Sequence, residues 1–171
     1  HKWLMAPKGS AFLYAKPKSQ QLLKSLIISW GDKWENPADS DFLTEFEFKG
    51  TRDISAFLSV PEAIKFHQKY LNEANRKQIN NLIKYSKKKL TEVLKTKPIT
   101  TSSRWNIQMY SHPLPENTNK KDLKNFLYKK HKIEIPITNI DNKLFIRISI
   151  QIYNNKQEIY YLVETLKKYY K

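Results

Sequence analysis

The stretch that decides the fold is Leu144-Phe145-Ile146-Arg147-Ile148-Ser149-Ile150-Gln151-Ile152-Tyr153. Aliphatic residues occupy every second position from Leu144 onward, which predicts a strand with one face on a hydrophobic core. Arg147 is the single charged residue in this stretch and lies on the other face. Its guanidinium matches a carboxylate in bidentate geometry, so it is a candidate anion-binding residue. The competing interpretation is an arginine on a solvated sheet face.

The segments around this strand predict a small α+β layer. Apolar residues at helical spacing predict a long amphipathic helix upstream, with its core face at Ile79, Leu82, Ile83, Leu90, Val93 and Leu94. The other predicted elements are a strand at 105–110, a loop at 112–119, a helix at 120–131, a strand at 133–137, a turn at Asp141-Asn142 and a helix at 156–170. Such an order favours helices on one face of a short sheet. We expect one domain over 1–76 and another over 77–171.

The first 76 residues give weaker patterns. We expect a short buried strand over 10–16, a second apolar run over 22–30, a loop over 31–41, and a strand or irregular extended segment over 42–48. Gly50 to Asp53 predicts a turn, with Asp53 as N-cap of a helix that begins near Ile54. Pro61 then kinks that helix or begins a new one.

Composition bounds the function. The 171 residues carry a formal net charge of +15 but only four arginines, and lysines are spread over nearly every segment. Scattered lysines favour solvated faces over a nucleic-acid interface. The chain has no cysteine, so thiolate metal sites and cysteine nucleophiles are excluded and no metal site is predicted. No apolar run reaches the length of a membrane span. We expect a cytoplasmic protein with neither a nucleic-acid nor a membrane partner.

Four stretches together resemble the class V aminotransferase-type pyridoxal-phosphate (PLP) enzymes, and most closely the isopenicillin N epimerase-like branch. They are His1-Lys2-Trp3-Leu4-Met5-Ala6-Pro7-Lys8-Gly9, Leu26-Ile27-Ile28-Ser29-Trp30-Gly31, Gly50-Thr51-Arg52-Asp53-Ile54-Ser55-Ala56-Phe57-Leu58-Ser59-Val60-Pro61 and Arg147-Ile148-Ser149-Ile150-Gln151-Ile152-Tyr153-Asn154. They occur in the family's order at compatible separations. The fold this resemblance implies is α/β: the C-terminal portion of a PLP-dependent fold-type I (aspartate aminotransferase-like) enzyme, comprising the end of the large domain and the small α+β domain.

The resemblance also implies roles. Lys2 would bind PLP covalently and move the Cα proton of an amino acid substrate, with His1 as a polar neighbour. Gly50 and Thr51 would bind the cofactor phosphate of the neighbouring subunit in a homodimer. Arg147 would hold the substrate α-carboxylate.

The reaction outcome stays open between epimerisation, C–S lysis and transamination. Cysteine desulfurases of the family carry a nucleophilic cysteine shortly before the carboxylate-binding arginine, and 133–146 has none, which argues against that subgroup. The residues that face the pyridine ring and form most of the phosphate site have no counterpart in this chain. The chain alone is therefore expected to bind PLP poorly and to be inactive. The alternatives are a basic nucleic-acid-binding module, whose binding would weaken steeply with salt, and a non-catalytic partner subunit derived from this family.

Overall fold

The computed structural model describes residues 1–33, 40–100, 102, 104 and 108–171. Its contacts divide the chain into two compact units, His1–Gln68 and Lys69–Lys171, and each unit is described by itself. The predicted domains, 1–76 and 77–171, stay a prediction.

The second unit is built on α5 (Glu73–Leu94), the long helix that the sequence predicts. Asn72 is its N-cap, because the Asn72 side chain accepts a hydrogen bond from the Asn75 backbone N–H at 3.0 Å. The helix ends where Lys95 adopts a left-handed conformation, with φ of 54°. Five of its predicted core residues are buried, and Val93 packs partly buried against the same core.

Three antiparallel strands form the sheet, in the order β1 (Met109–Pro113), β3 (Lys143–Ser149), β2 (Ile137–Ile140). Asp141 and Asn142 join β2 to β3 with φ of 50° and 60°. Positive φ at both residues gives a two-residue hairpin turn whose twist matches the right-handed twist of the strands. Ile146, Ile148 and Ile150 are buried, so the predicted core face of this strand is confirmed.

Three strand boundaries differ from the sequence prediction. Strand β1 runs to Pro113, into the predicted 112–119 loop, because it pairs with β3 from Met109↔Ser149 to Pro113↔Phe145; residues 105–107 of the predicted strand lie outside the described part. Strand β2 begins at Ile137, so 133–136 is not a strand, although Pro136 accepts a hydrogen bond from the Arg147 backbone. Strand β3 ends at Ser149, because Gln151 to Asn154 forms a turn closed by the Asn154 backbone N–H.

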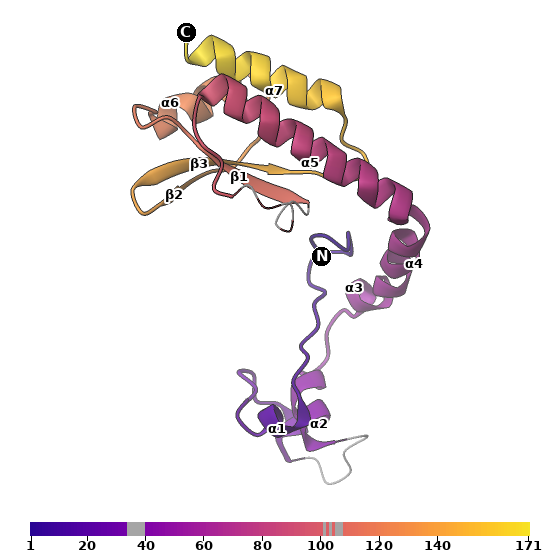
Figure 1. Ribbon diagram of the computed structural model, residues 1–171. Coiled ribbons are helices and arrows are strands. Elements are labelled where there is room, and N and C mark those ends of the chain that lie inside the picture. The colour runs from indigo at the N-terminus through magenta and orange to yellow at the C-terminus, as the bar shows by residue number, and fades with distance from the viewer. Residues whose placement is uncertain (34–39, 101, 103, 105–107) are drawn as a thin grey trace. The chain divides into compact units, whose positions relative to one another are not determined.

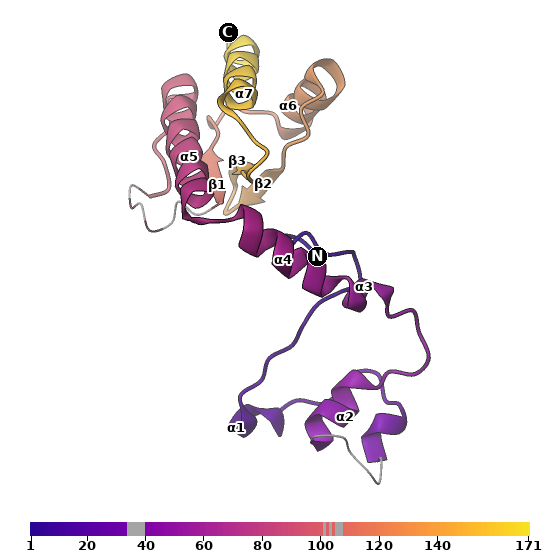
Figure 2. The same ribbon diagram turned by 90° about the vertical axis from the view of Figure 1, so that its right-hand side faces the viewer.

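This unit also contains α6 (Lys120–Asn125), continued by the π-turns of η3 (Phe126–Lys130), and α7 (Lys156–Tyr169). Asn155 and Glu158 form a reciprocal capping box at the start of α7. Helices α5, α6 and α7 cover one face of the sheet, as Figures 1 and 2 both show. This confirms the predicted layer, and burial of each Leu or Ile in it stabilises the fold by about 1.5–3 kcal/mol.

The first unit contains α1 (Pro17–Gln20), η1 (Trp30–Lys33), α2 (Asp41–Glu47), α3 (Ser55–Leu58) and α4 (Val60–Tyr70), which runs just past its boundary. Its described residues include no strand, so the predicted buried strand over 10–16 is wrong. Phe12 in that segment is 93% exposed. A strand needs a neighbour for its backbone N–H and C=O groups, and this unit offers none.

The segment 42–48 is also corrected, because it forms the helix α2 rather than an extended segment. Ser40 caps it by accepting a hydrogen bond from the Leu43 backbone N–H at 3.2 Å. The rings of Phe42 and Phe46, four residues apart, lie 4.6 Å from each other. Gly31 of η1 lies so close to the Thr44 backbone that a Cβ atom would collide with it.

The turn before α3 differs from the prediction by one residue. Ile54 is the N-cap of α3, and Asp53 lies one residue earlier. The Asp53 carboxylate accepts hydrogen bonds from the Ser55 hydroxyl at 2.5 Å and the Ser55 backbone N–H at 2.8 Å. Pro61 is the second residue of α4, so a new helix begins there rather than a kink.

Candidate functional site

Arg147 lies on β3 beside an open cavity of about 360 Å³. Its backbone N–H donates to the Pro136 carbonyl at 3.1 Å, which keeps the 133–136 segment alongside the strand. Its Nε atom is buried and has no hydrogen-bond partner among the described residues. Leaving such a donor unpaired costs about 1–3 kcal/mol.

The cavity beside Arg147 combines polar and apolar walls. Ser149, Lys132 and Tyr161 line it, together with the apolar Ile135 and Leu162. Lys132 adopts a left-handed backbone conformation with φ of 57°. Glu134 and Glu158 also line the cavity, so its two cations, Lys132 and Arg147, are matched by two carboxylates. The Ser149 side chain adds a hydroxyl, whereas the Tyr161 hydroxyl already donates to the His131 carbonyl at 3.2 Å.

Ser149 and Gln151 share a strand face with Arg147 in sequence, and the structure separates their roles. Ser149 is exposed and lines the same cavity. Gln151 is only 5% exposed, and its Oε1 atom accepts hydrogen bonds from Gln108 Nε2 at 3.2 Å and from the Ile152 backbone N–H at 3.0 Å. Gln151 is therefore a structural residue that closes the end of the sheet.

Lys2 and His1 are exposed at the start of the first unit. The Lys2 carbonyl accepts a hydrogen bond from the Met5 backbone N–H at 3.0 Å, and Met5 has a φ of 58°. A second turn follows at once, where the Ser10 hydroxyl donates to the Pro7 carbonyl at 2.8 Å. Two successive turns thus shape the backbone next to Lys2 and leave its side chain exposed.

Gly50 and Thr51 form an exposed bend between α2 and α3. Gly50 has a φ of 89°, and no atom lies within 4 Å of the position a Cβ would take. Glycine is therefore favoured by backbone conformation rather than by close packing. After the bend, the Arg52 guanidinium lies 4.9 Å from the centre of the Phe57 ring, and hydrogen bonds from Ser55 lower the pKa of Asp53. The Thr51 hydroxyl stays exposed.

Among the hydrogen bonds of the described residues, none joins Lys2 to the Gly50-Thr51 bend. The resemblance assigns that bend to the cofactor of a neighbouring subunit, so no direct contact is expected within one chain. Lys2 and the bend belong to the first unit and Arg147 belongs to the second. The roles of these four residues and of His1 stay predictions. No group of metal-ligating side chains occurs within the described ranges.

A buried polar network at His112 was missed by the sequence reasoning. His112 is fully buried, and its Nδ1 lies 2.6 Å from the Tyr110 hydroxyl while its Nε2 lies 2.9 Å from the Thr96 hydroxyl. The Thr96 hydroxyl donates its one proton to the Pro113 carbonyl at 2.7 Å, so it accepts from Nε2–H. Because burial keeps the imidazole neutral, Nδ1 carries no proton and accepts a hydrogen bond from the Tyr110 hydroxyl. Burial lowers the pKa of His112 to about 4 and raises the pKa of Tyr110 to about 12.

The network could have been found from the alternation Tyr110, His112, Leu114, whose side chains are all buried on the sheet. Thr96 lies two residues after the end of α5, so the network fixes the end of that helix to β1. Its role is structural rather than catalytic.

The chain matches the family model of aminotransferase class V over residues 1–162. The chain belongs to the class V aminotransferase family. This result confirms the resemblance, and the PLP-dependent character of the family supports an α/β chain of fold-type I.

Three curated relatives match almost the whole chain. Isopenicillin N epimerase of Amycolatopsis lactamdurans is 29% identical over 98% of this class V chain and 45% of its own length. The enzyme of the same name from Streptomyces clavuligerus is 28% identical over 97% of this chain and 44% of its own. A probable chloroplastic L-cysteine desulfhydrase of Arabidopsis thaliana is 26% identical over 97% and 38%. The chain thus spans less than half the length of these relatives. Among the described helices, none is long and apolar enough to cross a membrane.

Proposed function

We propose that this chain forms the C-terminal part of a PLP-dependent homodimeric enzyme that acts at the Cα atom of an amino acid. Epimerisation, C–S lysis and transamination are the candidate outcomes. The family match over residues 1–162 supports the enzyme class. The similarity to two isopenicillin N epimerases and a probable cysteine desulfhydrase supports reactions that begin at Cα.

The proposal that this chain binds the substrate carboxylate rests on the buried, unpartnered Nε of Arg147. A guanidinium at a cavity binds a carboxylate through parallel N–H···O bonds, and the planar fork fixes the orientation of the bound acid. Arg147 is therefore proposed to bind the α-carboxylate and to orient the amino acid. Ser149 lies on the same wall and adds a hydroxyl donor.

The donor set of the first unit fits the cofactor. An exposed primary amine at Lys2 can bond to the PLP aldehyde, and the exposed Thr51 hydroxyl beside the Gly50 amide can donate to a phosphate. When bound, PLP stabilises negative charge at the Cα atom of an amino acid. Lys2 is proposed to hold the cofactor and to move the Cα proton, with His1 as its polar neighbour. Gly50 and Thr51 are proposed to bind the phosphate from the other subunit.

The test is covalent labelling of the intact protein. The protein is incubated with PLP, reduced with borohydride and digested, and the peptide masses are measured by mass spectrometry. A pyridoxyl group is expected on Lys2. Lys2→Ala should abolish the label, whereas Lys8→Ala, a matched exposed lysine six residues later, should retain it. A label on another lysine, or none, would contradict the assignment.

A second experiment tests Arg147 without depending on turnover. Amino acid binding to the PLP-loaded protein is followed by the change in cofactor absorbance. Arg147→Lys should weaken binding by about 10- to 100-fold, because hydrogen bonds to charged groups contribute about 1.5–3 kcal/mol. Arg104→Lys, at an exposed position, should leave binding unchanged. Equal binding by both variants would show that Arg147 does not hold the carboxylate.

A further inference from the structure

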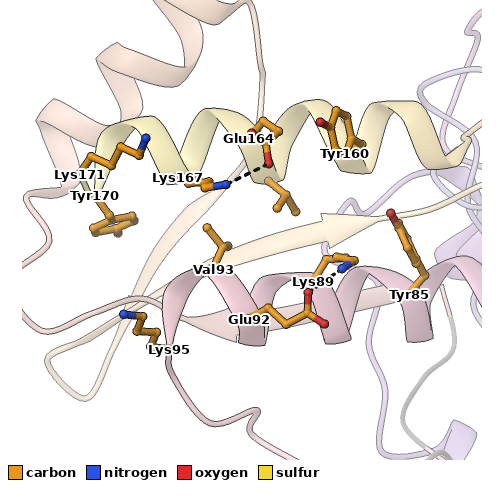
Figure 3. A pocket seen from close by; sticks show the side chains of 11 residues that line it. Tyr85, Lys89, Glu92, Val93, Lys95, Tyr160, Glu164, Lys167, Tyr170 and Lys171 are labelled. Atoms are coloured by element: carbon orange, nitrogen blue, oxygen red, sulfur yellow. Dashed lines mark hydrogen bonds and ion pairs between the residues drawn. The ribbon is translucent and has the colours of Figure 1, made fainter.

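An open groove runs between α5 and α7 on the helical side of the sheet, apart from the Arg147 cavity (Figure 3). Its volume is about 650 Å³, within the range of about 300–1,000 Å³ that is typical of binding pockets. Tyr85 and Tyr160 stand at one end, and Tyr170 and Lys171 stand at the other. From Tyr85 to Lys95 the groove follows α5 for about 15 Å, given a rise of about 1.5 Å per residue.

The floor of the groove is apolar and its ends are aromatic. Val163 of α7 is 8% exposed, and Val93 of α5 packs partly buried against the core. Tyr160 is 60% exposed at the rim. The Tyr170 hydroxyl lies 2.7 Å from the Thr118 hydroxyl, which holds that ring in place. An apolar centre with fixed aromatic residues at its border is the composition of a protein–protein contact.

The ion pairs of the groove leave it open. Lys89 pairs with Glu92 at 2.6 Å within α5, and Lys167 pairs with Glu164 at 3.9 Å near the end of α7. Each pair runs along its own helix, and no ion pair of the described residues crosses between the two helices. The two helices are therefore not joined by charge over the apolar floor.

The groove carries an excess of positive charge. Its lining has four lysines and two glutamates, a balance of +2. Lys95 and Lys171 form no ion pair with any described carboxylate. Both stand at the end of the groove where α5 and α7 end. Lysines there complement the helix dipoles, yet their ammonium groups remain available to an acidic partner.

We infer that this groove docks an acidic amphipathic helix of a partner protein. A helix of about three turns matches the length of the groove and would set its apolar face on Val93 and Val163. Glutamates or aspartates beside that face would pair with Lys95 and Lys171. A basic helix of the same shape would meet the positive excess and be repelled.

The test uses the intact protein that contains this chain and a fluorescein-labelled peptide of about fourteen residues, with leucines every three to four positions and glutamates at most others. Its matched control peptide carries lysines in place of the glutamates. Fluorescence anisotropy should show binding of the acidic peptide only. Binding should weaken several-fold when ionic strength is raised from about 0.05 M to about 0.3 M, because rim charges are screened.

Variants locate the binding. Lys95→Gln combined with Lys171→Gln should lower the affinity for the acidic peptide by about fivefold or more. The control, Lys121→Gln combined with Lys124→Gln on α6, should change this affinity by less than about twofold. Tyr160→Ala should weaken it by about tenfold. Tyr128→Ala is the control, since Tyr128 is similarly exposed, at 54%, on η3.

Three results would overturn the inference. The first is equal binding of acidic and basic peptides. The second is binding that the groove variants leave unchanged. The third is binding of inorganic phosphate at the same lysines without binding of either peptide, which would make the groove a small-anion site.

Discussion

At the scale of single residues, His112 is fully buried and has a hydroxyl partner at each ring nitrogen. It holds β1 to the segment after α5 through Tyr110 and Thr96. Lys87 approaches the same network, with its Nζ atom 5.5 Å from the centre of the Tyr110 ring. Burial disfavours a proton on His112, and Lys87 would repel it, so the folded state favours the neutral imidazole.

This neutral histidine predicts a loss of stability in acid. The pKa of His112 is about 4 in the folded state and 6.5 ordinarily. As pH falls below about 6.5, the unfolded chain binds a proton there while the folded chain does not, so folding weakens by up to about 3 kcal/mol until pH reaches about 4. Urea unfolding at pH 7 and pH 4 measures this loss.

Two variants isolate the contribution of His112. His112→Gln should be less stable at pH 7 and should lose about 3 kcal/mol less than the parent between the two pH values. His131→Gln changes a histidine whose hydrogen bonds to Tyr161 are exposed, and it should keep the parent's full acid loss. If His112→Gln lost as much as the parent, the acid effect would belong to other groups.

The Arg147 guanidinium is expected to favour carboxylate binding and to lower the free energy of unfolding. Because its Nε is buried without a partner, Arg147→Met should leave the chain equally stable or more stable by about 1–2 kcal/mol in urea unfolding. The same variant should fail to bind the amino acid carboxylate in the intact enzyme. A loss of more than about 1 kcal/mol would mean that the guanidinium is needed for folding.

At the scale of elements, the capping box of α7 is the clearest local contribution. The Asn155 side chain accepts hydrogen bonds from the Gln157 and Glu158 backbone N–H groups at 2.9 and 3.1 Å. Asn155→Ala should therefore cost about 1 kcal/mol of unfolding free energy, measured by urea titration. Asn117→Ala, at an exposed loop position, should stay within about 0.5 kcal/mol. Equal effects would show that the cap contributes little.

The elements that the sequence predicts well are those with many matching positions. Helices α5 and α7 and strand β3 each repeat their apolar period over several turns or pairs, so packing and pattern agree. The segments 10–16 and 42–48 were mispredicted because each is short. A run of so few residues is compatible with both a helical and a strand period. In 42–48, the contact between Phe42 and Phe46 decides for a helix, whereas alternation with acidic residues suggested a strand.

The candidate site was likewise predicted from the sequence only in part. Alternation alone places Arg147 on the face of β3 opposite the core, and the family resemblance names Lys2, Gly50 and Thr51. The burial of the unpartnered Nε depends on tertiary packing, which no local pattern encodes. His112 was missed because its partner Thr96 lies sixteen residues away.

At the scale of the whole molecule, apolar burial is unequally divided. The hydrophobic core cluster runs from Leu71 to Leu166, entirely within the second unit. In the first unit, Ala6 is the one buried apolar residue among those described, and Leu26 is 99% exposed. The second unit therefore holds nearly all of the packing that resists unfolding.

This division predicts two levels of protection in hydrogen exchange. Amides of α5, β3 and α7 should exchange at least about a hundredfold more slowly than amides of residues 10–30, because local opening of the first unit costs little. Limited proteolysis should cut first within 10–30 and leave a fragment that contains 69–171. Equal protection across both units would contradict the prediction.

The left-handed pair Asp141 and Asn142 has a consequence for evolution by insertion and deletion. It sets the alignment Ile140↔Lys143, and through it the partner of every residue along β3. Because side chains alternate between faces, a one-residue slip in this pairing would turn the guanidinium of Arg147 toward the hydrophobic core and the isoleucines toward solvent. An added residue at this tip should therefore be tolerated only where the loop takes it up and the alignment of β2 with β3 stays unchanged.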